Sequence, residues 1–307
     1  VGQIDYFATL QNTHQIESGA KYTLRSHVAD SQDELWDYAE EKWVIDDSNV
    51  NDLDYQQHIF AAYASYGYRF SKLTLKAGTR LEYTLNRGLS KSASGNLTFD
   101  NSNFNIVPYL NAAWKIDSRN TLSASYTRRL GRPSVTYLNP YIFEESPYSK
   151  MHGNPDLRTV VSDALTLTYR TSGETWDLTA RTYGSLCNNK IEYLSEVYPD
   201  GGKVSTYRNA VIHNHIDEML SFSWSPGKRF SLQTSAMLGY KWFHAPSLEQ
   251  KNDVIGWSFD LSSNVDLWKG AMGFVAGSIS GGETTLQRTY HGVDYVYSLG
   301  LRQGFLQ

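Results

Sequence analysis

The segment between Asp30 and Asp54 is rich in side chains that could bind a ligand. It carries ten carboxylates, with Lys42 as its single basic residue. Carboxylate oxygens suit hard cations such as Ca²⁺, but the glycine and the final glutamate of an EF-hand loop do not fall at the required positions. A solvated surface loop is therefore favoured over a cation site. The rings of Trp36, Tyr38 and Trp43 in this segment could stack on a sugar or another ligand.

Metal and catalytic motifs are otherwise scarce. His213 and His215 would share one face of a strand, a spacing that permits metal binding, but no third ligand accompanies them. The sequence has no His-Glu-x-x-His pair, P-loop, dinucleotide fingerprint or nucleophile elbow. Cys187 is the single cysteine, which excludes an intrachain disulfide and a cysteine-rich metal site. We therefore predict a protein that is not an enzyme and that has no metal centre and no cofactor.

Five short turns punctuate the chain at nearly even intervals. They are Ser71-Lys72, Asp117-Ser118-Arg119-Asn120, Ser172-Gly173-Glu174, Pro226-Gly227-Lys228 and Trp268-Lys269-Gly270. Each is flanked by alternating polar and apolar stretches of about ten residues or more. The longer polar loops between them cover residues 27–54, 88–103, 130–161, 198–204, 244–252 and 280–287. Strands joined alternately by short turns and long loops are typical of transmembrane β-barrels, whose short turns face the periplasm.

The alternation gives each strand one apolar face and one polar face. The apolar face includes Phe60, Leu73, Leu81, Leu110, Leu122, Leu165, Leu178, Leu220, Leu232, Phe259, Val265, Met272, Phe274, Tyr297 and Leu299. The other face carries Lys76, Arg80, Glu82, Arg128, Arg170, Asp177, Arg181, Lys241 and Asp260, which suit an aqueous lumen. We count about 13 such strands.

Aromatic residues gather at both ends of the strands. Phe70, Trp114, Trp176, Trp224, Phe230 and Trp268 lie beside the short turns, and Tyr83, Tyr126, Tyr240 and Trp242 lie nearer the long loops. Two such belts are typical of the two membrane interfaces. A soluble β-sandwich is the alternative, but it would not explain charges on the second face or strands longer than about six residues. No apolar run of about 18 residues exists, so a transmembrane helix is excluded.

The predicted fold is therefore all-β, a transmembrane antiparallel up-and-down β-barrel in the bacterial outer membrane, in contact with its lipids. An open sheet edge in hydrocarbon would leave backbone groups unpaired, and bacterial barrels prefer an even number of strands. We therefore expect residues 1–307 to be one barrel domain that is part of a larger barrel. Net charge is −4 and the basic residues are scattered, so nucleic acid is not an expected partner.

The longest loop contains a series of short motifs. They comprise Arg128, Arg129, Arg132 and Pro133, then Asn139 and Pro140, then Gly153, Asn154 and Pro155. The X-Pro steps favour extended or turn geometry, and glycine and asparagine tolerate positive φ. Loops of this length are uncommon unless they are functional or packed on something. We interpret this loop as a structured cap over the barrel wall, with direct ligand contact as the alternative.

These motifs also resemble a known family. The stretch SYTRRLGRPSVTYLNPY, followed by GNPDL and DALTLTYR, resembles the barrel of TonB-dependent outer-membrane receptors, in particular the Bacteroidetes-type outer-membrane β-barrel family. The segments at 188–192, 207–210, 77–82 and 297–302 are similar to it as well. Two positions depart from the usual pattern: Arg158-Thr159-Val160-Val161 replaces a Pro-Glu, and a glycine expected after Asn209 is missing.

The resemblance implies a receptor that takes up a scarce nutrient through a plugged barrel, with energy from TonB. It implies that the plug, the contact with the TonB complex and about three further strands lie outside this sequence, and it leaves a surface lipoprotein partner open. For ligand contact we single out the loop aromatics Trp36, Trp43, Tyr137, Tyr141 and Tyr148. A passive porin or a structural, adhesive barrel is the alternative function, and a soluble lectin-like protein is the third.

Overall fold

One large antiparallel sheet dominates the computed structural model, which describes residues 1–46, 50–92, 95–146, 148–268 and 270–304. Its main path has thirteen strands, which agrees with the sequence-based count. In hydrogen-bonded order they are β1 (Gly2–Leu10), β2 (His14–Ser31), β5 (Asn51–Arg69), β6 (Leu73–Ser92), β7 (Gly95–Lys115), β8 (Asn120–Gly131), β11 (Val160–Ser172), β12 (Trp176–Val197), β13 (Lys203–Gly227), β14 (Phe230–Ala245), β15 (Gln250–Trp268), β16 (Ala271–Thr284) and β17 (Thr289–Gln303).

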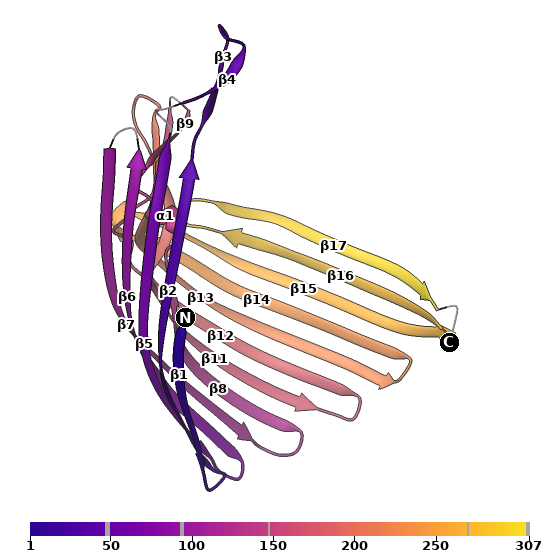
Figure 1. The fold of residues 1–307 in the computed structure, drawn as a ribbon. Helices are drawn as coiled ribbons and strands as arrows, with labels where there is room; N and C mark the ends of the chain where they lie inside the picture. The colour runs from indigo at the N-terminus through magenta and orange to yellow at the C-terminus, as the bar shows by residue number, and fades with distance from the viewer. Residues whose placement is uncertain (47–49, 93–94, 147, 269, 305–307) are drawn as a thin grey trace.

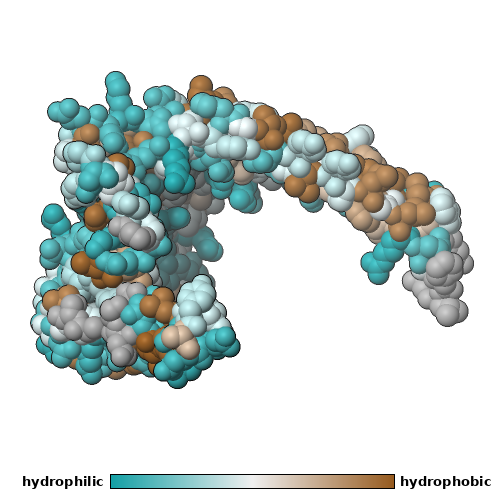
Figure 2. All heavy atoms as spheres, turned by 90° about the horizontal axis from the view of Figure 1, so that it is seen from above, coloured by the Kyte–Doolittle hydropathy of each residue, from teal (hydrophilic) through white to brown (hydrophobic). Residues whose placement is uncertain are grey.

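The sheet is a curved wall. Strands follow one another up and down, with β1 and β17 far apart along the path (Figure 1). Seen from above, the wall bends into an arc with a hollow on one side (Figure 2). We call the hollow side the inner face and the convex side the outer face. Within the described residues, no helix has the length and the apolar character needed to cross a membrane.

The five predicted short turns are confirmed at the ends of paired strands. They join β5 to β6, β7 to β8, β11 to β12, β13 to β14 and β15 to β16, although Lys269 lies outside the described residues. In the β7–β8 turn, Asp117 Oδ1 accepts from the backbone N–H groups of Arg119 (2.8 Å) and Asn120 (2.9 Å). Sequence reasoning missed a sixth turn between β1 and β2, where Gln11 and Asn12 adopt φ values of 51° and 56°.

The strand register confirms most of the two predicted faces. Leu81 pairs with Ile106 and Leu220 pairs with Ala236 on the outer face, where large apolar side chains stay uncovered; Leu165 is 62% exposed. The charges Lys76, Arg80, Glu82, Arg170, Asp177, Arg181, Lys241 and Asp260 fall on the inner face, as predicted. An outer face that is apolar and uncovered by protein is the pattern of a membrane barrel.

Two assignments to a face were wrong. Met272 and Phe274 pair with Asp266 and Asn264 on the inner face, not on the apolar face. The outward positions of β16 alternate glycine with Val275 and Ile279. The larger side chains of Met272 and Phe274 were therefore assigned to the apolar face. The other error is Arg128, which follows Tyr126 on the outer face of β8 and does not line the lumen.

Two of the three longest predicted loops are mostly strand. Residues 88–103 continue the β6–β7 ladder, with Gly88 opposite Phe99 and Lys91 opposite Asn96; residues 93–94 lie outside the described ranges. Residues 27–54 extend β2 and β5 as far as the pair Ser31–Asn51, and between them stands a separate hairpin of β3 (Glu34–Asp37) and β4 (Lys42–Ile45). The backbone ladder persists beyond the apolar band, where the apolar signal of the side chains is lost.

Candidate functional site

The loop between β8 and β11, residues 132–159, folds against the inner face near the long-loop ends of the strands. It contains α1 (Val135–Leu138), β9 (Ile142–Ser146) and β10 (Ser149–His152), and we call it the cap. Two cap leucines anchor it. Leu138 (0% exposed) and Leu157 (1% exposed) form a buried cluster with Leu53, Tyr55 and Phe99 of β5 and β7.

The motif residues shape the backbone of the cap. The N–H of Gly153 donates to the carbonyl of Asn139 (2.8 Å), and a Cβ at Gly153 would lie 2.4 Å from that oxygen. Asn154 Nδ2 donates to the carbonyl of Tyr207 on β13 (3.0 Å). Asn139 Oδ1 accepts from the N–H of Tyr141 (3.2 Å). The Gly-Asn-Pro sequence is thus needed for close backbone approach and for attachment to the wall.

Three asparagines of the wall hold the returning end of the cap. Asn101 Nδ2 donates to the carbonyl of Leu157 (2.8 Å). Asn209 binds both backbone groups of Arg158, through Oδ1 (2.8 Å) and Nδ2 (3.1 Å). Asn189 binds the backbone on both sides of Val160. Its Oδ1 accepts from Val161 N–H (2.9 Å), and its Nδ2 donates to Thr159 O (2.9 Å). Sequence reasoning noted the segments around residues 189 and 209 but gave these two side chains no role.

A buried ionic cluster ties the start of the cap to β6. Arg132 binds Glu82, and Arg80 Nη2 lies 3.0 Å from the same carboxylate. The Glu82 side chain is 3% exposed, so this charge is removed from water and depends on its two partners. Arg129 lies at an inward register position opposite Ser162, and Pro133 and Pro140 are half-buried in the cap.

The five candidate aromatics do not come together. Trp36 and Trp43 form an edge-to-face pair on the β3–β4 hairpin, with ring centroids 5.5 Å apart, and Trp43 is 63% exposed. Tyr148 is 70% exposed, whereas Tyr141 is buried. Tyr137 stacks on a wall tyrosine and is considered next.

Tyr137 belongs to the packing of the cap. Its ring stacks on Tyr207 of β13 at 3.9 Å, and Tyr193 of β12 approaches Tyr207 at 5.1 Å. Burial raises the pKa of Tyr207, and burial likewise raises the pKa of Tyr55 under the cap. Both phenols therefore stay neutral and act as packing and hydrogen-bonding groups.

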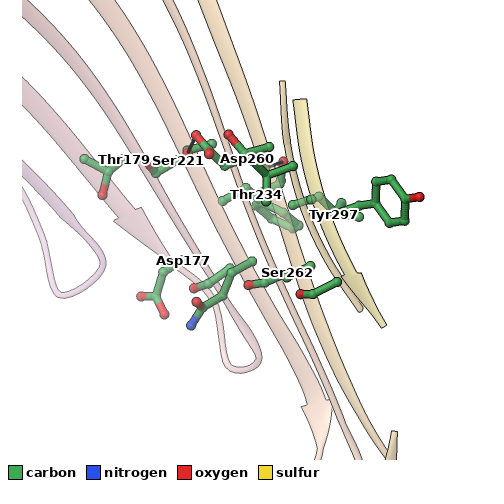
Figure 3. Close-up of a pocket in the computed structure, with 17 residues that line it drawn as sticks. Asp177, Thr179, Ser221, Thr234, Asp260, Ser262 and Tyr297 are labelled. Atoms are coloured by element: carbon green, nitrogen blue, oxygen red, sulfur yellow. Dashed lines mark hydrogen bonds between the residues drawn. The ribbon is translucent and has the colours of Figure 1, made fainter. Parts of the chain in front are cut away.

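A groove of about 560 Å³ runs over the inner face of β12–β17 (Figure 3). Its walls include Asp177, Thr179, Ser221, Ser235, Asp260, Ser262, Ser278 and Ser298, and the described residues that line it include no Lys or Arg. In Figure 3 the ring of Tyr297 points away from the groove. The groove therefore offers hydroxyl groups and carboxylates to whatever occupies the hollow.

The two histidines considered for metal binding lie on the inner face of β13. The rings of His213 and His215 are 5.2 Å apart, and His213 also stacks on Phe243 at 4.3 Å. Within the described part of the chain, no group of three or more His, Cys, Asp or Glu side chains is arranged to hold a metal ion.

The family model of the outer membrane protein beta-barrel family matches residues 1–307. The chain belongs to this family. It is therefore a protein of the bacterial outer membrane, and its apolar outer face contacts the lipid bilayer. No curated protein matches the chain.

Solved structures share the fold of this family member at low sequence identity. The copper transporter OprC superposes with a TM-score of 0.71 at 12% identity, over 97% of this chain and 47% of that one. The ferric yersiniabactin uptake receptor FyuA from Yersinia pestis gives 0.65 at 10% identity, over 97% and 45%. The FrpB iron transporter from Neisseria meningitidis gives 0.62 at 11% identity, over 98% and 48%. The chain thus spans about half the length of these proteins.

Membership of the family gives the wall a direction. In outer-membrane barrels the short turns face the periplasm and the longer connections face the outside. The cap and the β3–β4 hairpin, which stands above the wall in Figure 1, therefore lie on the extracellular side. The exposed aromatic side chains of the hairpin face the external medium.

Proposed function

We propose that residues 1–307 form part of the barrel of a TonB-dependent outer-membrane receptor of the Bacteroidetes type, which takes up a nutrient through a plugged barrel. The observation that carries this proposal is the hollow, polar inner face. The groove is lined by hydroxyl groups and carboxylates, and its described lining includes no basic side chain. Such a lining suits a second domain that fills the hollow and donates hydrogen bonds to it. The motifs of the cap support the same assignment through their resemblance to such receptors.

The length of the chain fits this proposal. It spans about half the length of a copper transporter, a ferric yersiniabactin uptake receptor and an iron transporter. A plug domain, its contact with the TonB complex and the remaining strands would occupy the other half. We infer that the protein is a transporter and not an enzyme, and a surface lipoprotein remains a candidate partner.

The extracellular aromatics are the proposed ligand contacts. Trp36 and Trp43 present an exposed pair of rings on a projecting hairpin, and Tyr148 is exposed on the cap. Tyr137 and Tyr141 would act indirectly, because their rings are held within the cap. Rings of this kind bind ligands by stacking at small entropic cost.

Two measurements on the full-length protein test the proposal. In planar bilayers a plugged receptor should show no steady conductance, whereas a passive porin should conduct as soon as it inserts. In cells, uptake of the growth-limiting nutrient should stop when TonB is removed. A permanently open channel, or uptake that persists without TonB, would contradict the receptor assignment.

A further inference from the structure

The outer face of the membrane-spanning wall carries a small charged patch. Within about ten residues of the short turns, the height of the apolar band, the strands present Arg128, Asp163 and Glu218 outward. No other described strand position in this band places an Asp, Glu, Lys or Arg on the outer face. All three lie on the adjacent strands β8, β11 and β13, with β12 between the last two.

Arg128 and Asp163 form the first half of this patch. Arg128 Nε and Nη2 donate to Asp163 Oδ1 (2.8 Å) and Oδ2 (2.9 Å), and the Tyr126 hydroxyl donates to Asp163 Oδ1 (2.7 Å). A guanidinium carries five N–H donors, more than one carboxylate can take. This ion pair therefore has donor capacity left for a further acceptor.

Glu218 is the second half. It lies between the outward-facing Ile216 and Leu220 on β13 and opposite Leu238 on β14. Among the described residues, the Thr182 hydroxyl is the one group that donates a hydrogen bond to it (2.9 Å). A carboxyl group facing hydrocarbon is costly, and ionisable groups within membranes are usually paired. The carboxyl of Glu218 thus has acceptor capacity left for a donor outside this chain.

Arg128 and Glu218 lie at nearly the same depth. Arg128 is eight residues after Asn120, where β8 leaves its short turn, and Glu218 is nine residues before Gly227, where β13 enters its own. At about 3.3 Å per residue and a tilt of about 40°, both lie roughly 20–23 Å above the periplasmic ends, within a band of about 25 Å. Both residues therefore lie near the extracellular edge of the band.

The surface between these two residues is suited to close approach. Across the ladder Arg128 lies level with Asn214, and Glu218 is four residues further along β13. Three strand spacings of ~4.8 Å and four residues of ~3.3 Å put the two residues about 20 Å apart. The line midway between them runs between β11 and β12 on the outer face, with Ala180, Thr182 and Gly184 of β12 on one side and the exposed Leu165 and Leu167 of β11 on the other. A Cβ added at Gly184 would meet no atom within 4 Å. Small residues allow two membrane-spanning surfaces to pack closely.

We propose that this outer face of β8–β13 binds a second copy of the chain. A two-fold axis along the membrane normal, through the line between β11 and β12, places Arg128 of each copy opposite Glu218 of the other. The symmetry makes the contact self-complementary. Because the axis runs along the membrane normal, Arg128 and Glu218 lie at the same depths in both copies. This dimer depends on the location in the outer membrane and not on the receptor function proposed above.

Cysteine cross-linking of the full-length protein in liposomes tests the dimer. The single native cysteine, Cys187, is first replaced by Ser. In that background, Gly184→Cys should give a disulfide-linked dimer because position 184 lies near the axis, whereas Leu110→Cys on the outer face of β7 should not. Cross-linking at both positions alike, or no cross-linked dimer at position 184, would overturn the proposal.

Charge exchange provides the second arm. Glu218→Arg should weaken the dimer about tenfold or more, and Glu218→Gln should weaken it less. The double variant Arg128→Glu/Glu218→Arg should regain part of the loss, since the two charges exchange places. Heat-modifiability on gels shows which variants fold. Association that is unchanged in folded Glu218→Arg protein would sink the dimer.

Discussion

The lower and upper halves of β5 place large apolar side chains in different surroundings. Near the periplasm the outward residues Phe60, Ala62 and Ala64 are apolar and uncovered. Further up, the inward residues Leu53 and Tyr55 are 4% exposed beneath the cap. The outward residues there are acidic, Asp52 and Asp54. The same strand therefore faces hydrocarbon with one side below and packs a protein core with the other side above.

The difference shows what decides the buried face of a strand. In the band, lipid replaces a protein core as the partner of the apolar side chains. Above it, water solvates the outer face, and the cap supplies an ordinary buried cluster on the inner face. An apolar side chain thus indicates lipid or a protein core as its surroundings only when the height of the residue along the strand is known.

Removing a cap anchor should disturb the upper half most. Leu138→Ala leaves a cavity at a fully buried position and should cost about 2–5 kcal/mol of cap stability. Limited proteolysis of residues 132–159 in detergent measures the loss. The control is Leu97→Ala, whose side chain is 51% exposed and should matter little. Equal protease resistance in both variants would show that the cap is not held by this cluster.

A charge in the lower half should separate the two faces. Leu110→Arg places the charge in lipid and should cost about 2–4 kcal/mol in bilayer unfolding, whereas Asn111→Arg on the inner face should cost much less. Urea titration of the protein folded into liposomes compares them. If the two variants lose the same stability, the outer face is not covered by lipid.

The asparagine clamps should have an intermediate effect. Asn209→Ala removes both bonds to Arg158 and should cost about 1–3 kcal/mol. Asn264→Ala is the matched control, because its one side-chain bond, to Ser231, is 3.5 Å long and exposed. Hydrogen exchange of the Arg158 amide should accelerate in the first variant only. Unchanged amide exchange in Asn209→Ala would show that Asn209 does not hold this part of the cap.

The projecting hairpin should contribute least to stability. Trp36→Ala should change the unfolding free energy by no more than about 0.5 kcal/mol, because the hairpin stands apart from the main sheet. If its rings contact the nutrient, affinity should fall about tenfold, as measured by calorimetry on the full-length protein. Undiminished affinity in Trp36→Ala/Trp43→Ala would remove these rings from the proposed ligand site.

The sequence was most informative where one rule applies along a whole strand. Turn chemistry and period-two alternation predicted the strand count, five of the short turns and the charges Lys76, Glu82 and Asp260 on the inner face. The alternation itself places Arg128 on the outer face, two residues after Tyr126, and the prediction failed there because the charge was taken to indicate the lumen. They failed at Met272 and Phe274 because glycine occupies the alternate positions and leaves no contrast.

The candidate site was harder to predict for a different reason. The cap depends on contacts between segments far apart in the sequence, such as Asn101 with Leu157 and Asn209 with Arg158. No local pattern specifies which asparagine binds which backbone group. Likewise, loop aromatics look alike in a sequence, although the structure buries Tyr141 and leaves Tyr148 exposed.

Spin labels along β7 would test the central claim most directly. Labels at Ile106 and Leu110 point outward, and labels at Val107 and Asn111 point inward. In liposomes, power-saturation measurements should show the first pair accessible to oxygen dissolved in lipid and the second pair accessible to a water-soluble nickel chelate or shielded by protein. Four labels with the same accessibility, or an outward pair reached by the nickel chelate, would contradict the account.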